Sequence, residues 1–465
     1  MGLLHPVAPW ALSDSLHLAA LPDRLGRTAL STGVVKQVTA AARAERQLVE
    51  ATDAAGVIAA TESLRAAATE VFAELGVPAP EWLVDAPLAY ETVVATSPAP
   101  SRGRNALRQL EAHLRDAVRV APSYQQLTRY FTHRHGTGGR TRLLDFCFDV
   151  LSAMERLRVL PDSTPAPVGT LPRGYLSLSA PSSTVFFQEL PGTDRIVLNK
   201  LYPGCLGALT RWADVPGLAS ELEAEIGVLA QARNPGCRTY QYTASADWTT
   251  VQRPAATSLP LAVCGAERAT SPMAATEAVP LAGFSLRHDV ATATLQIEDG
   301  SGPAALLYTG AVPPFLLSGV AAALGMISDP WTARLGASDG SSRSGFSPRV
   351  ELDGVVLRRA CWSISPAAMP TWDGEAGPME ALLRIHAAWR RMDLPNEIYV
   401  IAHRPGIPDK PSWLSLDHPL TLLTLLRGDP RVRSWTVTEA LPSVGAMRAE
   451  SVRKVTEYMA GLDHG

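Results

Sequence analysis

The residues best suited to chemistry in this sequence lie in a short basic segment, FTHRHGTGGRTR, at residues 131–142. It combines Arg134 and Arg140 with two histidines and three glycines. A glycine-rich turn exposes backbone N–H groups, and these N–H groups together with arginine side chains can hold a phosphate. The alternative is a solvated basic turn between two helices, a common feature of protein surfaces. The sequence leaves both interpretations open.

A second basic group consists of Arg349, Arg358 and Arg359, close to a predicted hairpin at residues 348–357. The hairpin is predicted because two short β-type runs flank the dipeptide Asp-Gly, a strong turn signal. Side chains alternate across a strand, so Arg358 and Arg359 are expected on opposite faces, and only one of them can join Arg349 in a site. The alternative role of these arginines is to protect an edge strand by charge.

Familiar catalytic and metal-binding motifs are absent from the sequence. It has no dinucleotide-binding or phosphate-binding glycine loop, no nucleophile elbow and no HExxH pair. The cysteines are odd in number, widely scattered and without zinc spacing: Cys147, Cys205, Cys237, Cys264 and Cys361. We therefore expect no metal, no bound cofactor and a reducing cytoplasmic location. No residue is assigned a catalytic role from these patterns.

Composition narrows the class of protein. The chain has 465 residues, of which 46% are hydrophobic and 19% charged, so we expect a globular protein with two or three sub-domains. The net charge of −3 does not favour a free-standing nucleic-acid binder, so any tRNA would need a local basic patch or another chain. The N-terminus lacks signal-peptide features. Prolines interrupt the uncharged stretch 302–328, which favours buried core over a membrane span.

The pattern of apolar residues predicts an α+β protein. The first part is mostly helical, and an alanine-rich region at 34–76 is expected to form two helices divided at Gly56. Mixed α/β sub-domains with short strands follow a segment rich in proline, serine and threonine at 160–174. We expect three sub-domains, comprising residues 1–160, 161–335 and 348–465.

Two helices are predicted near the end of the chain. An amphipathic helix at 378–393 places His386 beside Leu382, Leu383 and Trp389, which predicts a partnered core histidine. A closing helix is expected at 446–461.

Six segments, in order along the chain, resemble motifs of the lantibiotic dehydratase family. They are APLAYETVVA (86–95), FTHRHGTGGRTRLLDF (131–146), IVLNKLYPGCLGALTRW (196–212), VPLAGFSLRHDVATATLQI (279–297), PRVELDGVVLRRACW (348–362) and LPNEIYVIAHRPGIPDKPSWLSLDHPLTLLTLL (394–426). Each motif alone is weak, but six in the family's order are fairly specific.

The resemblance implies an activity. Such proteins transfer glutamate from glutamyl-tRNA to a Ser or Thr hydroxyl of a ribosomal precursor peptide, and a second domain then eliminates the glutamate. A carboxylate ester is a far better leaving group than a hydroxyl. The transfer needs no metal, but it needs a basic cleft for the tRNA end and donors for the ester carbonyl. Aminoacyl-tRNA, expected to be Glu-tRNA, is thus a co-substrate.

The resemblance also implies which residues contact tRNA or substrate. These are Arg134, Arg140, Asn199, Arg211, Arg349, Arg358 and Lys410. Asp417 and Glu439 also keep positions of the family's motifs, and we expect them to cap or pair within the fold.

The match covers only the later part of the transfer domain, which implies a split enzyme. The expected partners are a separately encoded N-terminal half, an elimination-domain protein, the precursor peptide and tRNA, with no membrane insertion. In the hairpin, the family's motif R-Y-G-R is replaced by Glu351-Leu352-Asp353-Gly354, so two basic positions are lost and two acidic residues appear, and Gly283 stands where the family has aspartate. These differences support an alternative, a non-catalytic scaffold or interaction subunit of a peptide-modifying complex. A third possibility is a component of a peptide aminoacyl-tRNA ligase.

Overall fold

The computed structural model describes most of the chain as two compact units. The described residues are 18, 21–25, 31–80, 83, 103–157, 182–204, 219–242, 259–264, 278–310, 317–333, 345–369, 371, 377–405, 410–426, 429–449 and 457–463. The first unit takes in Met1–Ser97, Pro122–Ser179 and Leu206–Pro330, and the second takes in Pro98–Ala121, Ala180–Cys205 and Trp331–Gly465. Arg211 and the segment 160–174 lie outside the described residues.

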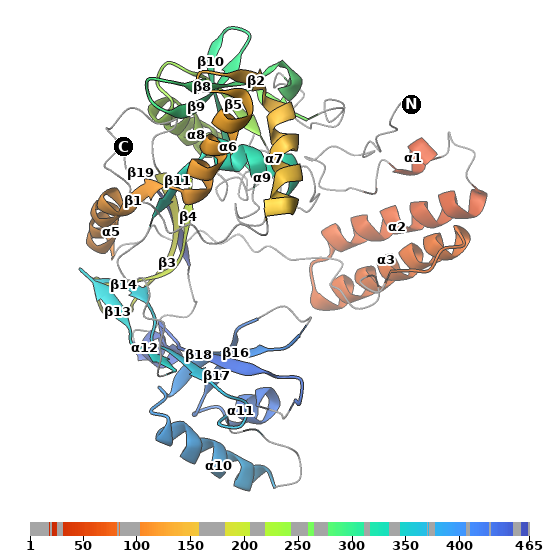
Figure 1. Ribbon diagram of the computed structural model, residues 1–465. Coiled ribbons are helices and arrows are strands. Elements are labelled where there is room, and N and C mark those ends of the chain that lie inside the picture. The colour runs from red at the N-terminus through yellow and green to blue at the C-terminus, as the bar shows by residue number, and fades with distance from the viewer. Residues whose placement is uncertain are drawn as a thin grey trace. The chain divides into compact units, whose positions relative to one another are not determined.

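The expected pair of N-terminal helices is present, but the break between them lies earlier than predicted. After α1 (Leu21–Leu25), helices α2 (Thr32–Glu50) and α3 (Ala54–Glu74) lie side by side (Figure 1). The side chain of Asp53 caps α3 by accepting the backbone N–H of Gly56 at 2.7 Å. Gly56 therefore lies in the first turn of α3, because capping by the aspartate, rather than the flexibility of glycine, starts the second helix.

The first unit also contains a seven-stranded mixed sheet in the order β2-β8-β9-β10-β5-β6-β7. Each strand from β2 through β8 and β9 to β10 is antiparallel to the next. From β10 onward, neighbouring strands β5, β6 and β7 run parallel. The bounds are α6 (Pro122–His135), β2 (Arg140–Arg142), α7 (Leu143–Leu157), α8 (Ala219–Arg233), β5 (Arg238–Tyr242), β6 (Leu261–Val263), β7 (Ala278–Pro280), η3 (Leu281–Gly283), β8 (Ser285–Asp289), β9 (Thr294–Asp299), β10 (Gly302–Tyr308) and α9 (Gly319–Ser328).

Helices α6, α7 and α9 pack against this sheet and against one another. Helix α9 contacts both α6 and α7, and α7 also contacts β8. Phe131 and Phe146 meet edge to face at 5.1 Å between ring centroids and are fully buried. Ile327 of α9 is buried as well, so the second part of the uncharged stretch 302–328 is core, as predicted from its interruption by prolines.

The second unit holds two five-stranded sheets. The first has the order β13-β14-β4-β3-β19 and packs against α5 (Arg104–Ala117). Its strands are β3 (Ser182–Glu189), β4 (Ile196–Pro203), β13 (Val350–Leu352), β14 (Val355–Arg358) and β19 (Tyr458–Asp463). A short two-stranded ladder joins β1 (Val118–Val120) to β11 (Trp331–Ala333).

The predicted hairpin is confirmed, and the predicted closing helix is wrong in its second half. Asp353 and Gly354 both have positive φ, 47° and 81°, as the tight turn between β13 and β14 requires. Among the described residues of the predicted helix, Ala446–Ala449 belong to a short helix, α12 (Val444–Ala449), whereas Tyr458 and the residues after it form β19, which pairs antiparallel with β3. Tyr458 and Leu462 pack on the core of this sheet, so long-range strand pairing overrides the local helical pattern.

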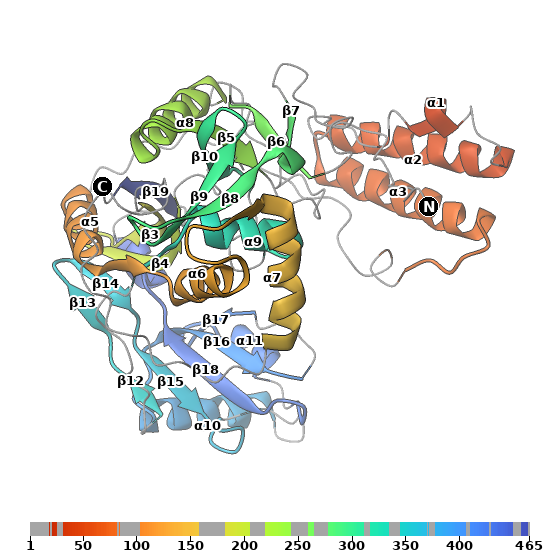
Figure 2. The same cartoon turned by 45° about the horizontal axis from the view of Figure 1, so that its top comes forward.

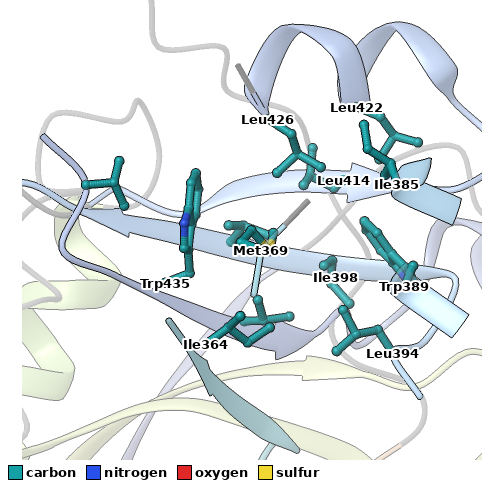
Figure 3. Close-up of a cluster of buried hydrophobic side chains, with 13 residues drawn as sticks. Ile364, Met369, Ile385, Trp389, Leu394, Ile398, Leu414, Leu422, Leu426 and Trp435 are labelled. Carbon is teal, nitrogen blue, oxygen red and sulfur yellow. The ribbon is translucent and has the colours of Figure 1, made fainter. Parts of the chain in front are cut away.

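The second sheet of this unit has the order β12-β15-β18-β16-β17. Its elements are β12 (Phe346–Ser347), β15 (Cys361–Ile364), α10 (Pro378–Arg391), β16 (Glu397–His403), β17 (Ser412–Ser415), α11 (Pro419–Leu425) and β18 (Ser434–Glu439). Helix α10 runs along one side of the sheet (Figure 2). Side chains of α10 and α11, including Trp389 and Leu422, form one buried cluster with Ile398 and Trp435 of the strands (Figure 3).

Helix α10 is amphipathic as predicted, but its buried face differs from the expected one. Ala381, Ile385 and Trp389 are buried, whereas Leu383 is 65% exposed and His386 is exposed. Residues four apart share a helix face, so the Ile385–Trp389 stripe turns residues 383 and 386 outward. His386 is therefore a surface residue and not a core histidine.

The architecture is α+β with a helical N-terminal part, as expected from the sequence. Within the part of the chain that the structure describes, no helix has the length and apolarity needed to cross a membrane.

The buried stripe of α10 gives a direct test of the second unit's core. We expect Ile385→Ala to lower the free energy of unfolding by about 2–5 kcal/mol, because it leaves a cavity in a fully packed cluster. Leu383→Ala, two residues away and exposed, is the matched control and should cost less than about 0.5 kcal/mol. Urea denaturation followed by tryptophan fluorescence measures both, and equal losses would contradict this placement of the helix.

Candidate functional site

The most connected polar group of the second unit begins with a pair of side chains, Arg349 and Glu439. Arg349 lies just before β13, and Glu439 ends β18 in the other sheet. The guanidinium donates from Nε to Oε1 of Glu439 at 2.7 Å and from Nη2 to Oε2 at 2.5 Å. This two-point geometry matches the planar fork of arginine to the carboxylate and is among the strong hydrogen-bonded arrangements in proteins.

Glu439 is buried, and its charge is stabilised by neighbouring donors. The backbone N–H of Ala360 donates to Oε1 at 2.8 Å, in addition to the two bonds from Arg349. Burial alone raises the pKa of this carboxyl, but the bonds from Arg349 and Ala360 and the charge of Arg359 hold the pKa below its ordinary value of 4.5. Glu439 is therefore an anion at neutral pH.

Arg359 extends this group to the strands of the first five-stranded sheet. Its Nη2 donates to Oδ1 of Asn199 at 2.6 Å and to the carbonyl oxygen of Leu441 at 2.7 Å. Asn199, on β4, in turn donates from Nδ2 to Oε1 of Gln188 at 3.3 Å and to Glu457. We call the connected residues Gln188, Asn199, Arg349, Arg359, Glu439 and Glu457 the arginine–asparagine network.

Burial shapes the electrostatics of Arg359. It lowers the pKa of the guanidinium, whereas Tyr399, Glu439 and Glu457 act in the opposite direction. Arginine nonetheless stays protonated at neutral pH because its ordinary pKa is so high. The Nε atom is buried and has no hydrogen-bond acceptor among the residues that the structure describes. An N–H without a protein acceptor, beside a fixed positive charge, is suited to donate a hydrogen bond to an oxygen atom of a ligand.

The sequence identified part of this network. Asn199 and Arg349 were expected to contact substrate, and Glu439 was expected to pair. Strand alternation predicted that only one of Arg358 and Arg359 would join Arg349, and the structure places Arg359 in the network. Arg358 is half-buried at the end of β14, and its expected contact with tRNA or substrate stays a prediction. Gln188 was missed because no local signal links β3 to residues far along the chain.

The acidic residues of the hairpin have partners inside their own sheet. Asp353 accepts from His113 of α5 at 2.9 Å, and Glu351 pairs with Arg195. These pairs tie the β13–β14 hairpin to α5 and to the turn before β4. The two acids that appear in this hairpin, where the family's motif has none, thus have structural roles in this chain.

The glycine-rich turn belongs to the first unit and is bonded internally. Arg134 lies 3.5 Å from Asp149, and Arg140 lies 3.0 Å from Glu298 and donates to Ser285. The N–H of Gly138 donates to the His288 ring at 3.3 Å. Both arginines are exposed and remain available to an anion only in competition with these carboxylates.

The remaining expected contacts are dispersed. Lys410 is exposed just before β17, and Arg211 lies outside the described residues. Among the residues that the structure describes, no group of three or more histidine, cysteine or acidic side chains is placed to hold a metal ion.

Comparison with known proteins identifies the fold. No family model matches the chain, and no curated protein matches its sequence. Solved structures do match, and they show that the chain has a lantibiotic dehydratase-like fold, as its resemblance to that family predicted.

Three of the similar structures, which represent two proteins, illustrate the likeness. One is the glutamylation domain TbtB from thiomuracin biosynthesis, with 16% identity, a TM-score of 0.58, and coverage of 92% of this chain and 57% of that chain. The same domain bound to 5'-phosphodesmethylglutamycin also gives a TM-score of 0.58. The other is the tRNA dependent lantibiotic dehydratase MibB from Microbispora sp. 107891, with 12% identity and a TM-score of 0.61, covering 98% of this chain and 49% of that chain. The chain thus spans about half the length of the structures it matches.

The Arg349–Glu439 pair yields a prediction with a defined pH dependence. We expect Arg349→Ala to lower the free energy of unfolding by about 2–3 kcal/mol at neutral pH, because the buried Glu439 carboxylate keeps only the Ala360 N–H as a strong donor. The pKa of Glu439 is lowered in the fold, so its stabilising contribution is present above the ordinary value of 4.5 and is lost as the pH falls through the lowered value. The difference in the free energy of unfolding between wild type and Arg349→Ala should therefore become smaller at acid pH.

Arg384→Ala provides the control for this measurement. Arg384 lies 4.0 Å from Glu380 in an exposed pair on α10, and its loss should change the free energy of unfolding by less than about 0.5 kcal/mol. Urea denaturation at neutral and acid pH compares the two variants. If the difference in the free energy of unfolding between wild type and Arg349→Ala stays constant down to acid pH, the proposed role of the Glu439 charge is excluded.

Proposed function

We propose that this chain is one component of a split lantibiotic-type dehydratase that transfers glutamate from Glu-tRNA to Ser or Thr of a ribosomal precursor peptide. The observation that carries the proposal is the fold, which matches the glutamylation domain TbtB at a TM-score of 0.58 and the lantibiotic dehydratase MibB at 0.61, over almost the whole chain. The six sequence segments in the family's order support the same function. The polar network of the second unit supplies residues suited to the reaction.

The reaction is an ester exchange. The Ser or Thr oxygen attacks the glutamyl carbonyl carbon and forms a new C–O bond, while the bond from that carbon to the tRNA ribose oxygen breaks. The hydroxyl proton ends on the released ribose oxygen, so the step needs no oxidant, reductant or metal. Negative charge develops on the carbonyl oxygen in the tetrahedral state, and fixed N–H donors stabilise it.

Arg359 is the residue of the network best suited to this task. Its positive charge is partly buried, which strengthens its interaction with a developing oxyanion. Two of its acceptors, Asn199 and Leu441, hold the guanidinium in a fixed orientation. The buried Nε has no protein acceptor among the described residues, which leaves a donor for the substrate. We propose that Asn199 and Glu439 position Arg359 and that Arg359 contacts the ester.

The proposal includes partner chains. A separately encoded N-terminal half is proposed to provide the rest of the transfer domain. An elimination-domain protein would then remove glutamate from the modified peptide. If the isolated chain proved monomeric and bound no product of neighbouring genes, this part of the proposal would be wrong.

The charge pairing of several arginines supports a second candidate function, a non-catalytic scaffold of a peptide-modifying complex. Arg349, Arg134 and Arg140 each pair with a carboxylate of this chain, so their charge is largely neutralised. A surface built to hold an RNA would keep such charges unpaired. The scaffold hypothesis predicts that substitutions in the network change stability but not the rate of peptide modification.

Substitution of Arg359 separates the two candidate functions. We expect Arg359→Lys to slow glutamyl transfer by about 100-fold or more, because lysine keeps the charge but lacks the planar fork that reaches Asn199, Leu441 and the substrate together. Arg115→Lys, in an exposed pair on α5, should leave the rate unchanged. The measurement is intact-mass spectrometry of the precursor peptide after co-expression with the adjacent reading frames, with circular dichroism as the check of folding.

Each outcome assigns a function. Glutamyl adducts or dehydrations that require this chain and Arg359 support the transferase. Modification that requires the chain but tolerates Arg359→Lys supports the scaffold. An added amino acid that stays on the peptide would instead identify a peptide aminoacyl-tRNA ligase component. Equal modification without the chain would refute all three.

A further inference from the structure

The arginine–asparagine network contains two carboxylates, and their surroundings differ. Both oxygens of Glu439 accept hydrogen bonds from the guanidinium of Arg349, and the backbone N–H of Ala360 also donates to one of them. Glu457 lies at the exposed margin of the network, and its Oε1 accepts a hydrogen bond from Nδ2 of Asn199. Among the residues that the structure describes, no donor occupies Oε2 of Glu457, so this oxygen is left for a group from outside the chain.

The absence of a direct ion pair suits Glu457 to take up a proton. A cation bound to a carboxylate favours the ionised form and opposes its protonation. Glu439, held at both oxygens by Arg349, is therefore unsuited to act as a base. No cation that the structure describes forms an ion pair with Glu457, and its side chain is exposed. Glu457 is thus the carboxylate of the network that can exchange a proton with a ligand.

Strand pairing near the end of the chain brings Glu457 to the network. Glu457 directly precedes β19, and Tyr458, the first residue of that strand, pairs with Phe187 of β3. The pairing places Glu457 beside Asn199 of β4, which is 258 positions earlier in the sequence. Glu457 lies outside the six segments that resemble the family's motifs, so its position at the network follows from the tertiary structure.

Asn199 joins Glu457 to Arg359 through a single amide group. Its Oδ1 accepts from Nη2 of Arg359 at 2.6 Å, and its Nδ2 donates to Glu457. This orientation of the amide is required, because a guanidinium can only donate and an ionised carboxylate can only accept. Two hydrogen bonds in series across one amide group keep the guanidinium and the carboxylate within about 8 Å of each other.

An acyl transfer needs a donor and a base at such a separation. The donor stabilises the carbonyl oxygen, and the base contacts the attacking hydroxyl and removes its proton. In the tetrahedral state both oxygens are attached to one carbon, so the donor and the base that contact them also lie within about 8 Å of each other. Arg359 and Glu457 meet this limit, and exposure increases from the half-buried Arg359 to the exposed Glu457, which gives a substrate access.

We infer that Glu457 is the general base of glutamyl transfer, with Oε2 taking the proton of the Ser or Thr hydroxyl while Arg359 donates to the ester carbonyl oxygen. This inference rests on the proposed function and adds a catalytic residue to it. The hydroxyl oxygen forms the new bond to the glutamyl carbon, and the bond from that carbon to the tRNA ribose oxygen breaks. The ribose oxygen then takes the proton from Glu457, so the carboxylate is regenerated and the atoms balance.

The test measures the rate of glutamyl transfer by the complex of this chain with its partner chains, supplied with Glu-tRNA and the precursor peptide. Glu457→Gln keeps an oxygen that can accept from Asn199 but loses the base, so kcat should fall about 100-fold or more. The KM values for the peptide and for Glu-tRNA should stay within about twofold, because the variant removes an interaction of the transition state. Glu380→Gln, in an exposed pair on α10, is the matched control and should keep the rate of wild type.

Chemical rescue separates a base from a structural contact. Glu457→Ala should regain activity as acetate is added, and formate, a weaker base, should restore less, because general-base catalysis follows the basicity of the proton acceptor. Chloride at the same concentrations controls for ionic strength and should restore nothing. A residue that only held Asn199 in place would not make the rate depend on the basicity of an added anion.

Two results would overturn the inference: a decrease in kcat of less than about tenfold in Glu457→Gln, or lost activity in Glu457→Ala that neither carboxylate restores. Failure of the proposed function is a different result. If the wild-type complex adds no glutamate to the precursor, the proposed function is rejected before any variant is compared, and the inference is rejected with it. If wild type and Glu457→Gln transfer glutamate equally well, the proposed function stands and only the role of Glu457 is rejected.

Discussion

The second unit depends on a buried carboxylate that must stay charged. Glu439 ends a central strand, and its burial is tolerable because Arg349 binds both oxygens and the Ala360 N–H donates to one of them. Removing either partner leaves a buried ion without compensation, which costs far more than an exposed pair contributes. The pair therefore fixes the segment before β13 against the end of β18, and the neighbouring Arg359 is held between the same two sheets.

The pairing of Glu439 with Arg349 also leaves the positive charge of Arg359 available at the site. Because Glu439 is neutralised by Arg349, the positive charge of Arg359 is not cancelled by a direct ion pair among the described residues. Neutral acceptors, Asn199 and the Leu441 carbonyl, orient Arg359 without removing its charge. A fixed cation with a spare buried donor is the kind of preorganised group that stabilises an oxyanion.

The fold and the charge of this chain depend on its side chains in different ways. Likeness to the structures of TbtB and MibB at 16% and 12% identity shows that the fold tolerates almost complete replacement of side chains. In the hairpin, Glu351 and Asp353 form pairs with Arg195 and His113 that hold the turn in place. Net charge is therefore a poor guide to function here, because these charged side chains are paired with one another within the fold.

The sequence by itself determined the fold class, the Asp353-Gly354 turn and the amphipathic character of α10, because these features depend on local periodicity and backbone preference. It also singled out Asn199 and Arg349 through the order of weak motifs. Only the tertiary structure decided that Arg359 faces Asn199, that Gln188 joins them and that Tyr458–Asp463 is a strand, because each depends on pairing between segments far apart in the chain.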